Sequence, residues 1–244
     1  MTTAERTQAE QAKEELRALA LAAKAELANA DAAQALAWTA RTFGAEWIVA
    51  SNMQDAVLID LAVKVRPQVD VLFLQTGYHF AETIGTRDAV ATVYPQVNIV
   101  NAEAKRSVAE QDLDEGPRLY EREPDRCCFL RKVVPLRETL AGYRAWVTGV
   151  RRVDAPTRAN TPIVDWDERN GLVKINPIAA WTDEEFNGYI AEHGILENPL
   201  VSDGYLSIGC APCTAKPLPG ADPRSGRWAG LAKTECGLHG GGEQ

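Results

Sequence analysis

The sequence contains no long apolar run. No stretch approaches the roughly 20 consecutive apolar residues that a membrane-spanning helix requires. Residues 1–6, MTTAER, lack the charged and then apolar pattern of an export signal. We therefore expect a cytoplasmic protein with no membrane contact. In that compartment thiols stay reduced.

The sequence also contains few histidines and carries no net positive charge. The 244 residues include only 3 histidines, and the formal net charge is −8 at pH 7. Because nucleic acids are polyanions, this balance argues against nucleic acid as a partner. It does not exclude a small anion held by a local group of arginines. The hydrophobic content of 45% is ordinary for a globular protein with a sizeable core.

Cysteine occurs five times, and an odd number fits poorly with a complete set of disulfides. Four of the five form two close pairs: Cys127 is next to Cys128, and Cys210 and Cys213 form a C-x-x-C. Adjacent cysteines rarely bond to each other, because the resulting ring is strained. Four converging thiolates would hold a soft metal centre, either zinc or an iron–sulfur cluster. The adjacent pair and the few histidines favour the cluster, while zinc and four inert buried thiols stay open as alternatives.

The fifth cysteine, Cys236, lies close to the C-terminus. Lys233 and His239 are within three residues of it, and cations lower the pKa of a nearby thiol. Gly237 gives the chain beside it freedom to bend toward a substrate. The local sequence therefore favours a reactive thiol over a chance cysteine.

Basic residues accompany the cysteine motifs. Lys132 follows Cys128 by about one helical turn. The other basic residues of interest come after a predicted strand or in the C-terminal segment: Arg151, Arg152, Arg158, Arg224 and Arg227. Arginine binds phosphate and sulfate through two parallel hydrogen bonds. Each residue alone would be ordinary surface charge, but together, in an acidic protein, they predict an anionic substrate.

An alternation of strands and helices begins near residue 45, after two alanine-rich helices that we expect to form a packing layer. The expected strands are 47–50, 69–74, 97–100, 145–148 and 172–175, and the expected helices are 56–65, 81–94, 127–140 and 182–193. This order predicts an α/β fold with a mostly parallel, twisted sheet flanked by helices. Ligands of such sheets bind beyond the carboxyl ends of the strands, which places residues 51–55 and 75–79 at one mouth.

Irregular structure is expected in three places. We expect a loop over residues 117–124, a bend or break at Pro135, and loop or a mobile tail after residue 198. The predicted organisation is a helical layer (1–44), a nucleotide-binding and cluster-binding domain (45–213) and a C-terminal tail (214–244) that closes on the substrate. The three parts are expected to act as one functional unit.

The joint pattern resembles assimilatory adenylyl-sulfate (APS) reductase, the thioredoxin-dependent, cluster-containing branch of the phosphoadenylyl-sulfate reductase family. The matching motifs are Cys127-Cys128 with Lys132, Thr148-Gly149-Val150-Arg151-Arg152, Gly209-Cys210-Ala211-Pro212-Cys213-Thr214, and Lys233-Thr234-Glu235-Cys236-Gly237-Leu238-His239. The resemblance covers the chain from about residue 45 to residue 239. Each motif is unspecific alone, and the combination is highly specific.

The resemblance implies a fold like that of ATP pyrophosphatases and adenine nucleotide hydrolases. It also implies one 4Fe–4S cluster per subunit, held by Cys127, Cys128, Cys210 and Cys213, and a nucleophilic Cys236. The implied substrate-binding residues are Lys132, Arg224, Arg227 and His239, with Arg151, Arg152 and Arg158 as a second basic set. Adenine and ribose are expected near Ser51, Asp55, Thr76 and Gly77. This mouth departs from the family pattern at two places. Residues 51–55 lack the family's usual glycine, and the motif that is commonly L-D-T-G reads Leu74-Gln75-Thr76-Gly77, with Gln75 in place of the aspartate.

The implied activity is the reduction of APS to sulfite and AMP in sulfate assimilation and cysteine biosynthesis. Thioredoxin would donate the electrons, an S-sulfocysteine would form on Cys236, and the cluster would not need to change its redox state. A homo-oligomer is expected. Three alternatives stay open: reduction of the 3′-phosphorylated nucleotide, sulfur transfer to tRNA, and a non-enzymatic iron–sulfur sensor. The last of these would leave the Cys236 tail unexplained.

Overall fold

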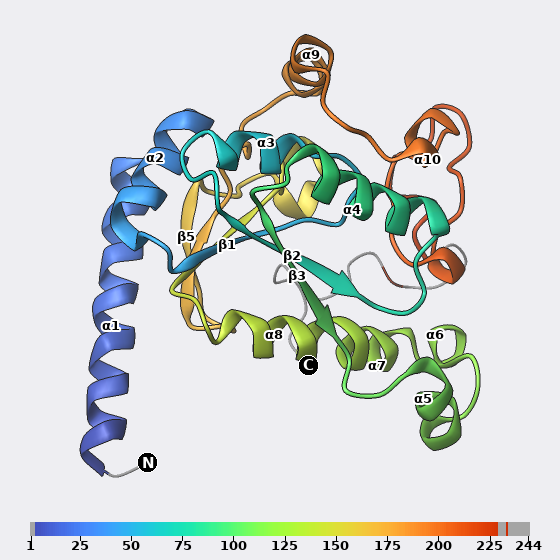
Figure 1. Cartoon of the computed structure of the whole chain (residues 1–244), viewed down its shortest axis with the longest axis horizontal. Helices are drawn as coiled ribbons and strands as arrows, with labels where there is room; N and C mark the ends of the chain where they lie inside the picture. The colour runs from blue at the N-terminus through green and yellow to red at the C-terminus, as the bar shows by residue number, and fades with distance from the viewer. Residues whose placement is uncertain (1–2, 229–232, 234–244) are drawn as a thin grey trace.

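The computed structural model describes residues 3–228 and residue 233. Six strands form one sheet with the order β3-β2-β1-β4-β6-β5 (Figure 1). Their bounds are β1 Trp47–Ala50, β2 Asp70–Gln75, β3 Asn98–Glu103, β4 Ala145–Thr148, β5 Val164–Asp167 and β6 Leu172–Ile175. All neighbouring strands are parallel except β5, which runs antiparallel to β6. The predicted fold class is therefore confirmed.

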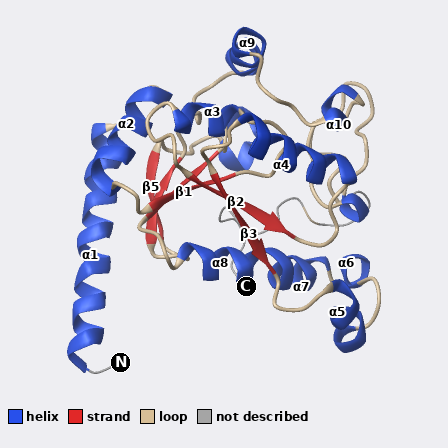
Figure 2. Cartoon of the chain, viewed as in Figure 1, coloured by secondary structure: helices blue, strands red, loops and turns tan. Residues whose placement is uncertain are grey.

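Both faces of the sheet are covered by helices, which explains why the central strands β1 and β4 and the middle of β2 are largely apolar. Ile48 of β1 is opposite Trp146 of β4, and both pack on one face with Leu136 and Leu140. The alternate residues, such as Val49 and Val147, belong to a larger core on the other face. Figure 2 shows α3 and α4 on one side of the sheet and α7 and α8 on the other.

The helices follow the predicted order closely. Their bounds are α1 Thr3–Glu26, α2 Ala32–Phe43, α3 Val57–Val63, α4 Ala81–Val93, α5 Val108–Glu115, α6 Leu119–Arg122, α7 Pro124–Cys128, α8 Val134–Leu140, α9 Asp183–His193 and α10 Pro199–Ser202. Helix α1 packs along β5 and β6 through Leu16, Ala20 and Ala23. Among the described residues, no helix combines the length and apolarity needed to cross a membrane.

Short turns complete the chain. They are the π turn η1 Phe129–Val133 and the 3₁₀ turns η2 Arg152–Asp154, η3 Pro156–Arg158 and η4 Ala211–Cys213. The predicted interruption or bend at Pro135 corresponds to the π turn directly before it, which separates α7 from α8, although helical structure continues from Pro124 to Leu140. In a regular α-helix the proline ring would clash with the carbonyl four residues earlier, that of Arg131. The wider π turn directly before Pro135 offers a physical reason why the helix continues.

Several further elements were not expected from the sequence, among them helix α5. Strand β5 is a short edge strand in which acidic residues alternate with apolar ones. The predicted loop 117–124 contains α6, one helical turn that is anchored by the fully buried Leu119. The chain after residue 198 is mostly irregular, as expected, but it includes α10 and η4.

The strand order reverses between β1 and β4, so the loops after these two strands meet at the switch point where α/β sheets bind ligands. The fully buried Asn198 holds the loop after β1. Its side-chain Nδ2 donates to the carbonyl of Met53 at 3.1 Å and to Thr83 Oγ1 at 3.2 Å. Its backbone N–H donates to the carbonyl of Gln54 at 2.9 Å. One side chain thus fixes the loop to α4 and to the chain entering α10.

Replacing Asn198 by alanine is expected to lower the free energy of unfolding by about 2–3 kcal/mol, because several buried polar groups lose their partner. The measurement is the urea unfolding curve of the purified protein. Asn187→Ala on the exposed face of α9 is the matched control and should change stability by no more than about 0.5 kcal/mol. Equal effects of the two substitutions would contradict the role of Asn198.

Candidate active site and metal centre

The two cysteine pairs line the same cavity. Helix α7 supplies Cys127 and Cys128, and the η4 segment supplies Cys210 and Cys213. The other lining residues are Tyr78, Tyr120, Pro124, Arg131 and Lys132. Three of the thiols are buried and that of Cys213 is partly exposed; none of the four is in a disulfide. The fold therefore brings together two motifs that are far apart in the chain.

The second pair docks onto the loop that follows β2. The backbone N–H of Ala211 donates to the carbonyl of Tyr78 at 2.7 Å. Thr76 Oγ1 lies 3.3 Å from Cys210 Sγ, within hydrogen-bond distance for sulfur. On the other side, the N–H of Trp228 donates to the carbonyl of Cys213 at 3.0 Å. The C-x-x-C segment is therefore hydrogen-bonded on one side to the loop after β2 and on the other side to Trp228.

The electrostatics of the cavity oppose ionised thiols. Burial, together with the neighbouring thiols of Cys128, Cys210 and Cys213, raises the pKa of Cys127 to about 12. Burial and Cys210 likewise raise the pKa of Cys213 to about 11. Lys132 Nζ lies 3.7 Å from Cys128 Sγ and favours the ionised form of both titrating thiols. Bound metal would release the thiol protons in the same way, because thiolates are the ligands.

The donor set is chemically suited to an iron–sulfur cluster. Four cysteine thiols line one cavity, and cysteine thiolates are the usual ligands of such clusters. Among the described residues, no group of three or more His, Cys, Asp or Glu side chains is arranged to hold a single metal ion. Four thiolates are also a donor set that zinc accepts, so residue type alone leaves both open.

Cations gather next to the cysteines, around the buried Trp228. Arg227, Lys233 and Lys132 lie over its indole ring at 4.6, 5.4 and 5.8 Å from the centroid. Lys233 is also paired with Asp125 of α7. Within the described part of the chain, the indole Nε1 and Arg227 Nε are buried without a hydrogen-bond partner. We call Lys132, Arg227, Lys233 and Trp228 the cation cluster.

Arg227 is held flat against the chain that leads to Cys210. It donates to Ser207 Oγ at 3.3 Å and to the carbonyl of Ile208 at 3.4 Å. A Cβ on Gly209 would overlap its guanidinium group, so a larger residue there would have to displace Arg227 from this position. Arg224 lies in the preceding turn, where its carbonyl accepts from the N–H of Arg227 at 2.8 Å.

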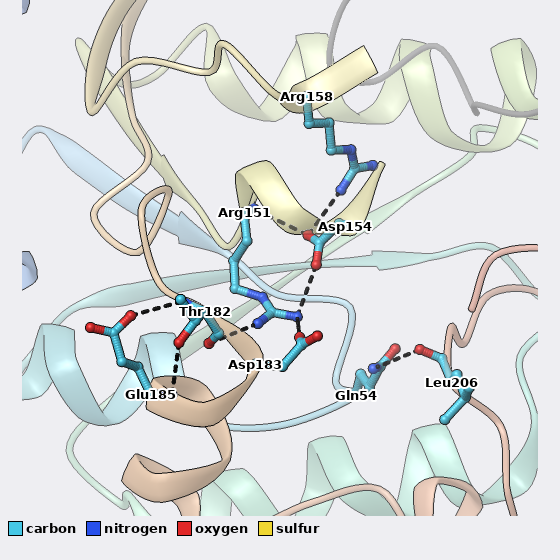
Figure 3. Close-up of polar contacts among 8 residues, drawn as sticks. All are labelled: Gln54, Arg151, Asp154, Arg158, Thr182, Asp183, Glu185 and Leu206. Carbon is cyan, nitrogen blue, oxygen red and sulfur yellow. Dashed lines mark hydrogen bonds and ion pairs between the residues drawn. The ribbon is translucent and has the colours of Figure 1, made fainter. Parts of the chain in front are cut away.

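The second basic set follows β4 and is bound by carboxylates. Arg151 pairs with Asp154 at 3.0 Å and with Asp183 of α9 at 2.9 Å (Figure 3). Arg158 shares Asp154 at 3.4 Å. Arg152 Nε donates to the carbonyl of Thr161 at 2.9 Å. In this structure Asp154 and Asp183 compensate much of the charge of Arg151 and Arg158.

The four residues predicted at the mouth lie in the loops after β1 and β2. Ser51 Oγ and Thr76 Oγ1 each accept from a backbone N–H two residues later, that of Met53 at 3.1 Å and that of Tyr78 at 3.2 Å. Gly77 has φ of 78°, the left-handed region that favours glycine. Asp55 Oδ1 accepts from the N–H of Val57 at the start of α3, at 3.0 Å.

Asp55 is the titratable group of this mouth. Burial raises its pKa to about 6, and the carboxylates of Glu197 and Asp154 act in the same direction. The hydrogen bond from Val57 and the charge of Arg151 oppose the shift without cancelling it. A carboxyl group with such a shifted pKa, at the ligand-binding edge of a sheet, is typical of functional sites.

Sequence reasoning missed Arg131, which organises the same loops. Its guanidinium is buried and donates to the carbonyl of Thr76, and to Gln111 Oε1 and the carbonyl of Arg106 at 3.2 Å each. It also lies over the ring of Tyr78. The only sequence signal was its place beside Lys132, which does not distinguish a structural arginine from surface charge. Cys236 and His239 lie outside the described residues.

The fold and the site together define a nucleotide-binding α/β protein whose ligand mouth adjoins a cysteine cavity and a group of cations. Residues 46–216 match the family described as phosphoadenosine phosphosulfate reductase domain. The chain belongs to this family, so the resemblance stated from the sequence motifs is confirmed.

Several curated relatives carry the name adenosine 5′-phosphosulfate reductase. The protein of Mycolicibacterium smegmatis is 67% identical over 92% of this chain and 95% of its own length. The protein of Streptomyces coelicolor is 58% identical over 96% of this chain and 98% of its own length. These names agree with the predicted APS reductase branch.

Solved structures give the same fold. A phosphoadenylyl-sulfate (PAPS) reductase from Candida auris, in a phosphate complex, has a TM-score of 0.69 at 27% identity. The match covers 80% of this chain and 96% of that one. An FMN adenylyltransferase from Candida glabrata has a TM-score of 0.52 at 12% identity, covering 81% of this chain and 63% of that one, and is alike in fold alone.

The raised pKa of Asp55 predicts a pH-dependent stability. As pH rises from about 4 to about 6, the unfolded state loses this proton before the folded state does, so the free energy of unfolding falls. Asp55→Asn removes the ionisation and should stabilise the protein by roughly 1–3 kcal/mol at pH 7, with little difference below about pH 4. Urea unfolding at several pH values measures this. The exposed Asp203→Asn serves as control, and a pH-independent effect of Asp55→Asn would contradict the assignment.

Proposed function

We propose that this chain reduces adenosine 5′-phosphosulfate to sulfite and AMP in sulfate assimilation. The observation that carries the proposal is one cavity at the ligand-binding edge of the sheet, lined by two cysteine pairs and by Lys132. The names of relatives 58–67% identical to this chain support the unphosphorylated nucleotide as substrate. Possession of both cysteine pairs favours the same choice, because members that use the 3′-phosphorylated nucleotide often lack them.

The cofactor in this proposal is one 4Fe–4S cluster, held by Cys127, Cys128, Cys210 and Cys213. When bound, it supplies a fixed inorganic charge centre beside Lys132 and the substrate. Lys132 is suited to such a neighbour, since it is buried and contacts Cys128 Sγ. Thr76 would help to hold the sulfur of Cys210 in place.

The substrate would span the two parts of the mouth. Adenine and ribose would lie near Ser51, Asp55, Thr76 and Gly77, and the phosphosulfate near Lys132, Arg224 and Arg227. Cations at that end reduce the repulsion between an anionic substrate and an approaching thiolate. Arg151, Arg152 and Arg158 would contribute from the end of β4, which requires Arg151 to exchange or share its carboxylate partners. His239 is proposed to join the site with the tail.

Cys236 is proposed as the nucleophile. Its thiolate would attack the sulfur of the phosphosulfate, and the bond between that sulfur and the bridging oxygen would break. AMP leaves as an anion and the product is an S-sulfocysteine. Lys233 supports this arrangement, because it lies over the Trp228 ring within the cation cluster and pairs with Asp125. Three further residues span at most about 11 Å of chain, which keeps Cys236 within reach of the site.

The reducing electrons would come from thioredoxin. One of its thiolates attacks the Cys236 sulfur, and sulfite departs with the electron pair of the sulfur–sulfur bond. The second thioredoxin thiol then resolves the mixed disulfide and restores the Cys236 thiol. The dithiol thus supplies two electrons for each sulfite. A cytoplasmic homo-oligomer is part of the same proposal.

The nucleophile is tested by the mass of the intact protein after incubation with APS without thioredoxin. The wild-type chain should gain the mass of one SO₃ group and release sulfite when reduced thioredoxin is added. Cys236→Ser should bind APS but gain no mass and release no sulfite. An SO₃ adduct that persists in this variant would refute the role of Cys236. Sulfite release from the 3′-phosphorylated nucleotide in preference to APS would favour the nearest rival activity. If neither nucleotide yields sulfite, the non-enzymatic sensor is favoured.

The cluster is tested by metal and sulfide analysis and by the visible absorption of anaerobically purified protein. Four iron and four sulfide per chain are expected for one 4Fe–4S cluster. Cys128→Ser should lose the colour and the activity, whereas the control Cys236→Ser should keep the colour and lose only the activity. Zinc in place of iron, or a colourless and fully active Cys128→Ser protein, would overturn the assignment.

A further inference from the structure

Gln54 connects the loop after β1 to the chain that carries the second cysteine pair. Its side-chain Oε1 accepts from the N–H of Ile208 at 3.0 Å. Its Nε2 donates to the carbonyl of Leu206 at 3.5 Å (Figure 3). A single carboxamide therefore pairs with one donor and one acceptor of residues 206–208. The Gln54 side chain thus satisfies one backbone N–H and one backbone carbonyl of this segment, as a neighbouring strand would in a sheet.

The loop end of this connection is fixed. The N–H of Gln54 donates to Asn52 Oδ1 at 3.1 Å, and its carbonyl accepts from the buried Asn198. Asn52 Nδ2 also reaches the carbonyl of Ile208, at 3.5 Å. These hydrogen bonds fix the Gln54 backbone within the loop after β1. Any movement of that loop therefore also moves the Gln54 side chain, and through its hydrogen bonds residues 206–208.

The other end leads directly to the cysteine cavity. Ile208 is buried, and Arg227 of the cation cluster donates to the same Ile208 carbonyl at 3.4 Å. Cys210 follows two residues later. The segment 206–208 is thus the point where contacts from the nucleotide loop and from the cation cluster meet.

We propose that Gln54 is a positioning residue that couples occupancy of the nucleotide loop to the placement of Cys210 and Arg227. The inference rests on the proposed function, in that it takes the loop after β1 as part of the nucleotide site. It adds a residue with no assigned contact to substrate or metal.

Gln54→Met tests the coupling, because methionine is of similar length and makes neither hydrogen bond. The backbone contacts of Asn198 leave the loop in place, so AMP should bind with an affinity within about threefold of wild type. A loosened segment 206–208 misplaces groups around the reacting sulfur, and such misplacement lowers turnover by about 10- to 100-fold. The KM for APS should change much less than kcat.

The direct measurement is hydrogen–deuterium exchange of the peptide covering residues 206–213, in the protein as purified, with and without AMP. In wild type, AMP should slow exchange of this peptide at least about fivefold, the lower end of typical coupling between sites. In Gln54→Met, exchange should be fast and insensitive to AMP although AMP still binds. Gln68→Met, at an exposed glutamine before β2, is the matched control and should behave as wild type.

Gln54→Glu is a second variant in case the methionine variant does not fold. It keeps the acceptor for Ile208 N–H but removes the donor to Leu206, so it should lose part of the AMP effect. The proposal is overturned if AMP does not slow exchange in the wild type, or slows it equally in the Gln54 variants. If calorimetry shows that the wild type binds no AMP, the nucleotide site of the proposed function has failed, which is a separate outcome.

Discussion

The cost of ionising four thiols in one largely buried cavity is the physical constraint around which the site is built. Burial raises the pKa of Cys127 to about 12, and the neighbouring thiols contribute in the same direction. A site of this kind works with thiolates only when positive charge is brought close. Lys132 provides it from within the same helical stretch, and Arg227 and Lys233 add to it from the C-terminal segment. The cations that lower the barrier to ionised sulfur are also those suited to an anionic substrate.

The fold keeps two basic groups in different states. The cation cluster stacks on Trp228 and retains net positive charge, whereas Arg151 and Arg158 are bound by Asp154 and Asp183. Both lie at the carboxyl edge of the sheet, but only the first adjoins the cysteines. The two groups therefore differ in what they connect. The first group packs around Trp228 beside the cysteines, whereas Arg151 of the second group links the end of β4 to Asp183 of α9.

Much of the fold could be predicted from the sequence because its signals are local. Apolar runs gave the strands of the parallel sheet, and the Thr182 capping box gave the start of α9, where Thr182 Oγ1 accepts from Glu185 N–H. The convergence of the cysteine pairs was expected from residue type alone. What could not be predicted depends on tertiary contacts. Asn198 and Arg131 are ordinary polar residues until burial makes each hydrogen bond obligatory, and Arg151 could not be assigned its carboxylate partners without the position of α9.

Gly209 shows how far such tertiary constraint extends. A Cβ at this position would meet the guanidinium of Arg227, which donates to the carbonyl of Ile208 and stacks on Trp228. A side chain at Gly209 would therefore have to push that guanidinium aside. The absence of a side chain at one residue thus sets where a cation from the C-terminal segment can rest, directly beside the cysteine that follows that residue.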